Sequence, residues 1–136
     1  MNNITIHTKK TDTFTDFLQN NGFEVEAIED DIYRVVREDE LPVYLAVGEE
    51  AIYFEVDLGN VSGFAGKELF FKLLDANTEI LPVSFGINNS NPEDPRLVLA
   101  ESRVSGDLSD GEVLSVFDAL ELAADKAEEI LEPYLG

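Results

Sequence analysis

Cysteine and tryptophan are absent from this 136-residue chain, and histidine occurs once. Without cysteine the chain can form no disulfide, thiolate metal site, iron–sulfur cluster or thiol nucleophile. The single histidine, His7, lies near the start of the chain, and a Ser-His-Asp triad would have to use it. These absences predict a protein with no cofactor and no metal, and they suit a reducing compartment.

Basic residues are also scarce. Nine Lys and Arg stand against 29 Asp and Glu, which gives a formal net charge of −20. Such a charge repels nucleic acid and anionic membranes, and it attracts basic partners. The same charge also serves simple solubility or life at high salt, so the acidity by itself leaves several interpretations open.

Long hydrophobic runs are missing as well. The longest apolar runs, such as residues 43–47, are far shorter than the roughly 20 residues that a membrane-spanning helix needs. The first residues lack the basic stretch followed by an apolar stretch that marks a secretory signal. We therefore expect a cytoplasmic protein that neither inserts into a membrane nor binds nucleic acid.

The remaining composition is that of an ordinary folded domain. Hydrophobic residues make up 44% and charged residues 28% of the chain, so disorder is not expected. The length is typical of one domain, and no repeat or linker divides it. We expect one α+β domain over residues 1–136, with residues 1–10 loosely ordered.

The hydrophobic pattern predicts elements in the order α-β-β-β-β-α-β-β-α. A short first helix places Phe14, Phe17 and Leu18 on one face and stops at Gly22. The short turns between the first four strands favour an antiparallel sheet, and the position of the helices favours their packing on one face of it. Strands are expected at residues 23–27, 32–37, 41–47, 51–58, 81–87 and 96–104, and a second helix at 67–75.

The last helix has the clearest pattern. Ser109 and Glu112 have the spacing of a capping box, in which the serine hydroxyl accepts a hydrogen bond from the glutamate amide. The face opposite the core-facing side is strongly acidic, as in a helix with a solvated outer surface. The core-facing side is expected to consist of Val113, Val116, Phe117, Leu120, Ala124, Ala127 and Leu131.

Segments that resemble catalytic or metal-binding motifs each depart from them at a required position. Pro82 stands where a G-x-S-x-G nucleophile elbow needs its first glycine. Residues 66–67 are the Gly-Lys pair that a phosphate-binding loop contains, but Glu68 follows them where that loop needs serine or threonine. Residues 107–111 resemble part of a calcium-binding EF-hand loop. If Gly111 is aligned with the glycine of that loop, Gly106 and Leu108 fall at positions where the loop needs calcium ligands. The sequence therefore predicts no catalytic residue and no metal site.

Two neighbouring strands are apolar at successive positions where a half-exposed strand would alternate with charges. A strand that is apolar on both faces needs cover on both faces. We expect the protein's own helices to cover one face and a second subunit or a bound client segment to cover the other. The alternative is that the tyrosines lie across the outer face with their hydroxyls in water. The expected interface residues are Val43, Tyr44, Leu45, Ala46, Val47, Ile52, Tyr53 and Phe54.

In three segments the sequence resembles an uncharacterised bacterial family, the YjfI type. These segments are residues 41–47, residues 81–87 and the acidic final helix. The order of elements also resembles the type III secretion chaperone-like fold, whose class I members are homodimers that hold an extended stretch of effector. Members of the YjfI type are encoded beside envelope-stress proteins of the phage-shock type, so the resemblance implies a partner with long basic and acidic helices.

The function predicted from the sequence is therefore protein binding without catalysis. We expect a chaperone-like or adaptor homodimer with a protein partner. Two alternatives stay open at this point. One is an acidic decoy that occupies nucleic-acid-binding surfaces, and the other is an enzyme that uses a pocket of carboxylates.

Overall fold

The computed structural model describes residues 11–104 and 108–135 of the chain. The expectation that residues 1–10 are loosely ordered lies outside the described residues. The predicted order of helices and strands is confirmed, and a short 3-10 helix, η2, follows the last helix. The elements are α1 (Thr11–Asn20), β1 (Glu24–Glu29), β2 (Ile32–Val36), β3 (Val43–Val47), β4 (Ala51–Gly59), α2 (Lys67–Ala76), β5 (Ser84–Asn88), β6 (Arg96–Val104), α3 (Asp110–Leu131) and η2 (Glu132–Tyr134).

The strands form one six-stranded sheet with the order β1-β2-β3-β4-β6-β5. Every neighbouring pair is antiparallel. The first four strands follow one another as a meander, and β6 lies between β4 and β5. The β4–β6 pairing extends from Ala51 opposite Val104 to Gly59 opposite Leu97. The predicted α+β class with an antiparallel sheet is thus confirmed.

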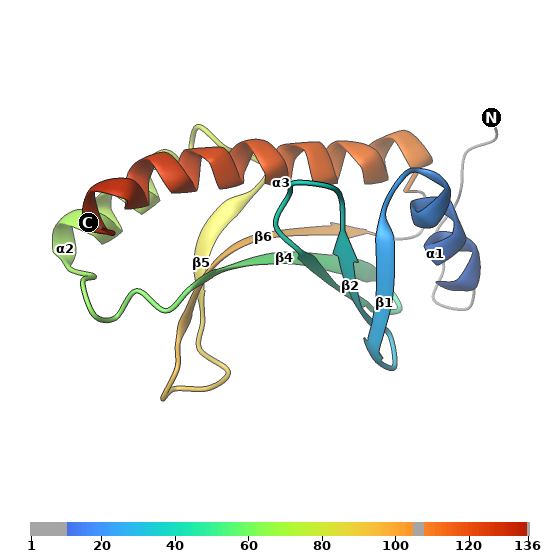
Figure 1. Cartoon of the computed structure of the whole chain (residues 1–136), viewed down its shortest axis with the longest axis horizontal. Helices are drawn as coiled ribbons and strands as arrows, with labels where there is room; N and C mark the ends of the chain where they lie inside the picture. The colour runs from blue at the N-terminus through green and yellow to red at the C-terminus, as the bar shows by residue number, and fades with distance from the viewer. Residues whose placement is uncertain (1–10, 105–107, 136) are drawn as a thin grey trace.

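The helices cover one face of this sheet. α3 runs across that face, α1 lies near its first turns, and α2 lies beside its C-terminal half (Figure 1). On the opposite face the described chain carries no helix (Figure 1). The side of α3 that meets the sheet is the predicted apolar side, with one difference. Ala123 is fully buried, whereas Ala124, the predicted core residue, is only half-buried.

The start of α3 is fixed by the predicted serine cap. The Glu112 amide donates to the Ser109 hydroxyl oxygen at 3.2 Å, and that hydroxyl donates to Oε1 of Glu112 at 3.1 Å. Leu108, before the cap, and Val113, in the first turn, are both buried. A bonded cap with apolar residues on both sides of it sets the angle at which the chain enters the helix.

Aromatic rings connect α3 to the sheet at the centre of the core. The ring centroid of Phe117 lies 4.5 Å from that of Phe23 and 5.8 Å from that of Phe54, the latter in an edge-to-face arrangement. Such pairs contribute roughly 0.5–1.5 kcal/mol beyond the burial of their area. All three side chains are buried, so this cluster holds the long helix on the face of the sheet.

Two predicted strands start later in the structure than in the sequence pattern. β3 begins at Val43 and not at residue 41, and β5 begins at Ser84 and not at residue 81. Each delay follows a proline, Pro42 or Pro82. Proline has no N–H to donate to a strand ladder, so regular pairing starts after it.

Candidate protein-binding surfaces

The predicted interface on β3 and β4 divides between the two faces of the sheet. Three of the eight residues, Tyr44, Ala46 and Tyr53, lie on the face without helices, while the side chains on the helix-covered face are buried in the core. β3 therefore alternates in the usual way, with a tyrosine and an alanine on its outer side. The five buried members of the set are Val43, Leu45, Val47, Ile52 and Phe54.

The open face at these residues is a shallow, partly polar groove. Ala46 pairs with Tyr53 and Tyr44 pairs with Glu55 across the two strands. The tyrosines are 37% and 39% exposed, and the Tyr53 hydroxyl donates to Oε1 of Glu55 at 2.8 Å. Burial, and then the bond to Glu55, raise the pKa of the Tyr53 hydroxyl. The hydroxyl therefore stays protonated and holds the Glu55 carboxylate in place on this face.

A larger apolar surface lies on α2. Phe71 and Leu74 are 71% and 67% exposed, and Phe70 on the same helix is exposed too. A groove between α2 and the edge strand β5 adds Ile87. We call these four residues, Phe70, Phe71, Leu74 and Ile87, the α2 surface. Together they expose roughly 400 Å² of apolar area, if a large side chain offers about 150–250 Å². That equals the largest patch on a typical monomer.

The sequence analysis predicts a helix at residues 67–75 but does not predict the α2 surface. Only Leu69 and Leu73 of its large apolar side chains are buried. The signal that could have revealed the surface is the number of apolar residues. Leu69, Phe70 and Phe71 are consecutive and therefore span about 200° of the helix circumference, which is wider than one core-facing stripe.

The position of α2 is fixed by contacts at its two ends. Lys72 on its outer side pairs with Glu68 at 3.1 Å and lies 5.5 Å from the ring of Tyr134 in η2. The Tyr134 ring stacks in turn on Phe64, before the helix, at 5.9 Å. After the helix, the Phe85 amide of β5 donates to Oδ1 of Asn77 at 2.6 Å. These contacts connect α2 to η2 and to β5 and so help to place the helix.

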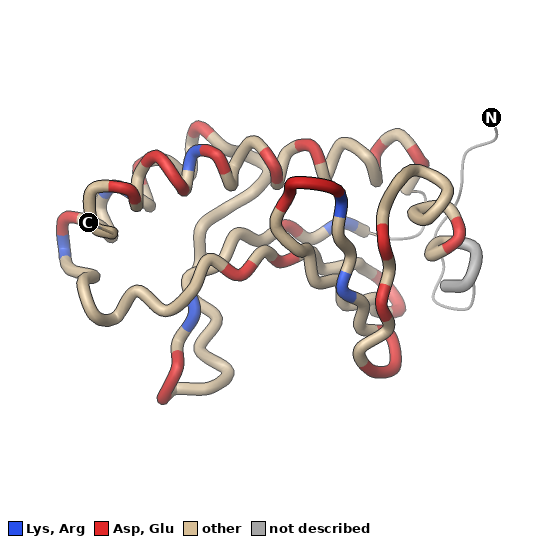
Figure 2. The backbone as a smooth tube through the Cα atoms, viewed as in Figure 1, with Lys and Arg blue, Asp and Glu red and all other residues tan. Residues whose placement is uncertain are grey.

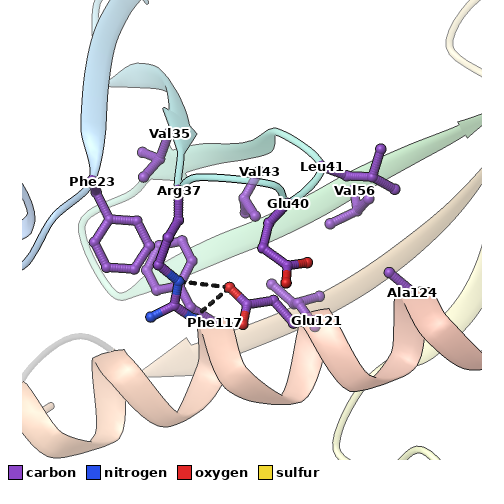
Figure 3. A pocket seen from close by; sticks show the side chains of 11 residues that line it. Phe23, Val35, Arg37, Glu40, Leu41, Val43, Val56, Phe117, Glu121 and Ala124 are labelled. Carbon is purple, nitrogen blue, oxygen red and sulfur yellow. Dashed lines mark hydrogen bonds and ion pairs between the residues drawn. The ribbon is translucent and has the colours of Figure 1, made fainter.

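Acidic residues gather over α3 and the connection between β2 and β3 (Figure 2). Arg37, at the end of β2, joins the two regions: its guanidinium donates to Glu121, with Nε–Oε2 at 2.8 Å, and to Asp118 at 3.0 Å. Figure 3 shows the same guanidinium beside the ring of Phe23, 4.8 Å from the ring centroid. These bonds hold the β2–β3 connection against α3, although Arg37 and Glu121 are more than 80 residues apart in the sequence.

Glu101 is a buried acid on the helix-covered face of β6. It lies opposite Phe54 in β4, and its Oε2 accepts a hydrogen bond from Nε of Arg103. Among the residues that the structure describes, its Oε1 is buried without a hydrogen-bond partner. A buried carboxylate is tolerated only where a cation compensates it, so Arg103 stabilises the fold here.

No three His, Asp or Glu side chains within residues 11–104 and 108–135 are grouped to hold a metal ion. In the same residues no helix has both the length and the apolar character needed to cross a bilayer.

Comparison with solved structures now identifies the fold. The chain folds like secretion-complex proteins. It superimposes on a chain of the heterodimeric ExoU–SpcU complex from the type III secretion system of Pseudomonas aeruginosa with a TM-score of 0.69 and 21% identity, covering 87% of this chain and 97% of that one. YbjN from E. coli, proposed to be a transcription regulator, matches with a TM-score of 0.58 and 15% identity over 94% of this chain and 93% of its own.

These likenesses confirm the expected secretion chaperone-like fold. No protein-family model matches the sequence, and no curated protein matches it either. The resemblance to the YjfI type therefore stays a prediction.

Proposed function

We propose that this chain is a non-enzymatic protein-binding module that acts as a cytoplasmic homodimer with a chaperone-like or adaptor role. The α2 surface is the observation that carries this proposal. Its exposed side chains are large and apolar and lie together on α2 and the neighbouring strand β5, as in the centres of protein interfaces. A chain of the same fold also takes part in a heterodimeric complex, which supports a role in binding proteins.

Charge explains why the second copy would contact the α2 surface and not another face. Two copies that each carry −20 repel each other over most of their area. α2 carries two lysines and two acids, so its own charge is balanced. A standard interface buries about 800 Å² per partner. The α2 surface provides an apolar centre for such an interface.

The exposed apolar area also separates this proposal from the alternatives. A decoy of nucleic-acid-binding surfaces would present carboxylates along its binding face. An enzyme with a carboxylate site would enclose its acids in a pocket. The most exposed large side chains of α2 are apolar, and they favour a protein partner.

The open face of the sheet is the second place that we propose for a client. Tyr44, Ala46 and Tyr53 are the members of the predicted set that a partner can reach, because the other five are buried. A partner among the phage-shock-type proteins rests on the family resemblance alone and is part of this proposal.

Sedimentation equilibrium tests the homodimer. We expect the wild-type chain to have twice the monomer mass of 15.1 kDa. The double substitution Phe71→Asp with Leu74→Asp places two carboxylates at the centre of the interface and should give the monomer mass. Both residues are exposed, so far-UV circular dichroism should show an unchanged fold.

A matched control uses apolar residues that are exposed elsewhere. Val104→Asp with Ile28→Asp adds the same charge on the strands β6 and β1, and this variant should stay a dimer. A monomeric wild-type chain, or a Phe71→Asp and Leu74→Asp variant with the dimer mass, would rule out the proposed homodimer.

A further inference from the structure

A groove lies between α3 and the connection that joins β2 to β3. Its floor is apolar and includes Leu41, Leu58, Leu131 and Leu135, and its volume is ≈ 440 Å³. Leu135 is 69% exposed and Leu41 is exposed as well. Leu41 and Ala124 both line this groove, and in Figure 3 they lie on the side of Glu121 that faces away from Arg37. The floor is therefore an apolar surface that solvent reaches.

The rim of the same groove is acidic. Asp39 and Glu40 approach from the β2–β3 connection, and Asp125 and Glu128 approach from α3. No lysine or arginine lines the groove in the part of the chain that the structure describes. The neighbouring cation, Arg37, already pairs with Asp118 and Glu121. The groove thus combines exposed leucines with carboxylates that nothing on its own surface neutralises.

These carboxylates are held close enough to affect one another. Burial raises the pKa of the Glu40 carboxyl, and the negative charges of Glu121 and Asp125 raise it further. The attraction to Arg37 acts in the opposite direction and is the smaller effect. The groove therefore concentrates negative charge, which a positively charged occupant would offset.

We propose that this groove binds a short amphipathic segment of a partner protein, with apolar side chains on the leucine floor and lysine or arginine on the acidic rim. The proposal deepens the protein-binding function by naming the chemistry of the partner. A second copy of this chain has a net charge of −20 and is repelled overall, and the sedimentation mass described below tests for it directly. Nucleic acid is repelled by the rim, while a basic segment gains both apolar burial and charge complementarity.

Fluorescence anisotropy with a labelled synthetic peptide tests the site. The peptide carries leucines at helical spacing on one face and lysines beside them. The double substitution Asp125→Lys with Glu128→Lys reverses half of the rim, and we expect it to weaken binding by about tenfold or more at low salt. Leu135→Ser, which removes an exposed part of the floor, should weaken binding by about threefold to tenfold.

Matched controls separate a groove from a general charge effect. Glu129→Lys with Glu93→Lys makes the same change in net charge at exposed residues outside the groove, and Val104→Ser removes an exposed apolar side chain on β6. Both controls should keep most of the affinity. A peptide of the same composition with its leucines spread around the helix should bind more weakly than the amphipathic one.

Three results would overturn the proposal. One is equal binding of the two peptides, and another is an equal loss in the groove and control variants. The third is a change in the sedimentation mass of the Asp125→Lys and Glu128→Lys variant, which would place the groove between copies of this chain. A monomeric wild-type chain that still binds the peptide through the groove would contradict the homodimer and leave the groove proposal intact.

Discussion

α1 and α2 are helices of equal length, ten residues each, yet they use their apolar residues differently. In α1 the large apolar side chains Phe14, Phe17 and Leu18 are all buried. In α2, Leu69 and Leu73 are buried while two phenylalanines and a leucine face solvent. One buried stripe is enough to hold a short helix on a core. The additional apolar residues of α2 are therefore available for a partner.

The two edge strands of the sheet differ in the same sense. Three of the six residues of β1 are glutamates, and charges on an edge discourage pairing with another chain. β5, beside α2, has no charged residue. The edge near α1 is thus protected by charge, whereas the edge near α2 lies next to the surface that we propose a second copy covers.

The largest predicted difference in the free energy of unfolding is between alanine substitutions at the two adjacent leucines of α2. Leu73→Ala empties a buried position, and we expect it to lower the free energy of unfolding by about 2–5 kcal/mol. Leu74→Ala, at a 67% exposed position, should change it by less than about 0.5 kcal/mol at protein concentrations where the chain is monomeric.

Urea denaturation at several protein concentrations measures both values. Because dimerisation stabilises the folded state by mass action, the stability of the wild type should rise with concentration and that of Leu74→Ala should rise less. Equal losses from the two alanines at low concentration would remove the distinction between the two sides of α2.

The next largest change in the free energy of unfolding is expected when the buried Glu101 carboxylate loses its cation. Arg103→Met leaves the Glu101 carboxylate buried without its cation, and we expect a loss of about 2–3 kcal/mol. This is less than for a fully buried pair because the Arg103 side chain is 31% exposed. Adding Glu101→Leu should recover most of the stability, since an apolar pair needs no compensation. A double variant that is no more stable than Arg103→Met in urea would contradict this account of the pair.

The smallest effect concerns the like charges at the acidic groove. The folded state raises the pKa of Glu40, so the protonated form favours folding and that contribution is lost as pH rises through the raised pKa. Glu40→Gln should therefore stabilise the protein at neutral pH, by up to about 0.5 kcal/mol because solvent screens the site. The gain should vanish below about pH 3, where the wild-type carboxyl is protonated in both the folded and the unfolded state. Thermal unfolding at the two pH values measures it, and a gain that persists in acid would point to a cause other than charge.

The parts of the fold that sequence predicted well are those set by local patterns. Ser109 and Glu112 carry a cap that depends on residues three apart, and the structure has it. All six strands lie at or near their predicted positions, and the two largest shifts of a strand start follow prolines. The antiparallel order follows from short turns, which leave neighbouring strands little choice of direction.

The surfaces were harder to predict because they depend on which side of an element another element covers. Tyr44 and Val43 look equally apolar in sequence, but α3 packs over one side of β3 only. Phe71 and Leu73 look equally suited to a core, and only the placement of α2 separates them. The acidic groove joins residues near 40 with residues near 125, and no local pattern links such distant positions.

The bond between Arg37 and Glu121 has a consequence for the order of events during synthesis. The β1–β4 meander leaves the ribosome well before α3, so the apolar side of β3 and β4 first exists without its cover. The groove has no second wall until the last helix docks and Glu121 meets Arg37. A partner that binds there can thus engage only chains that have been translated through α3, and the groove distinguishes them from shorter nascent chains.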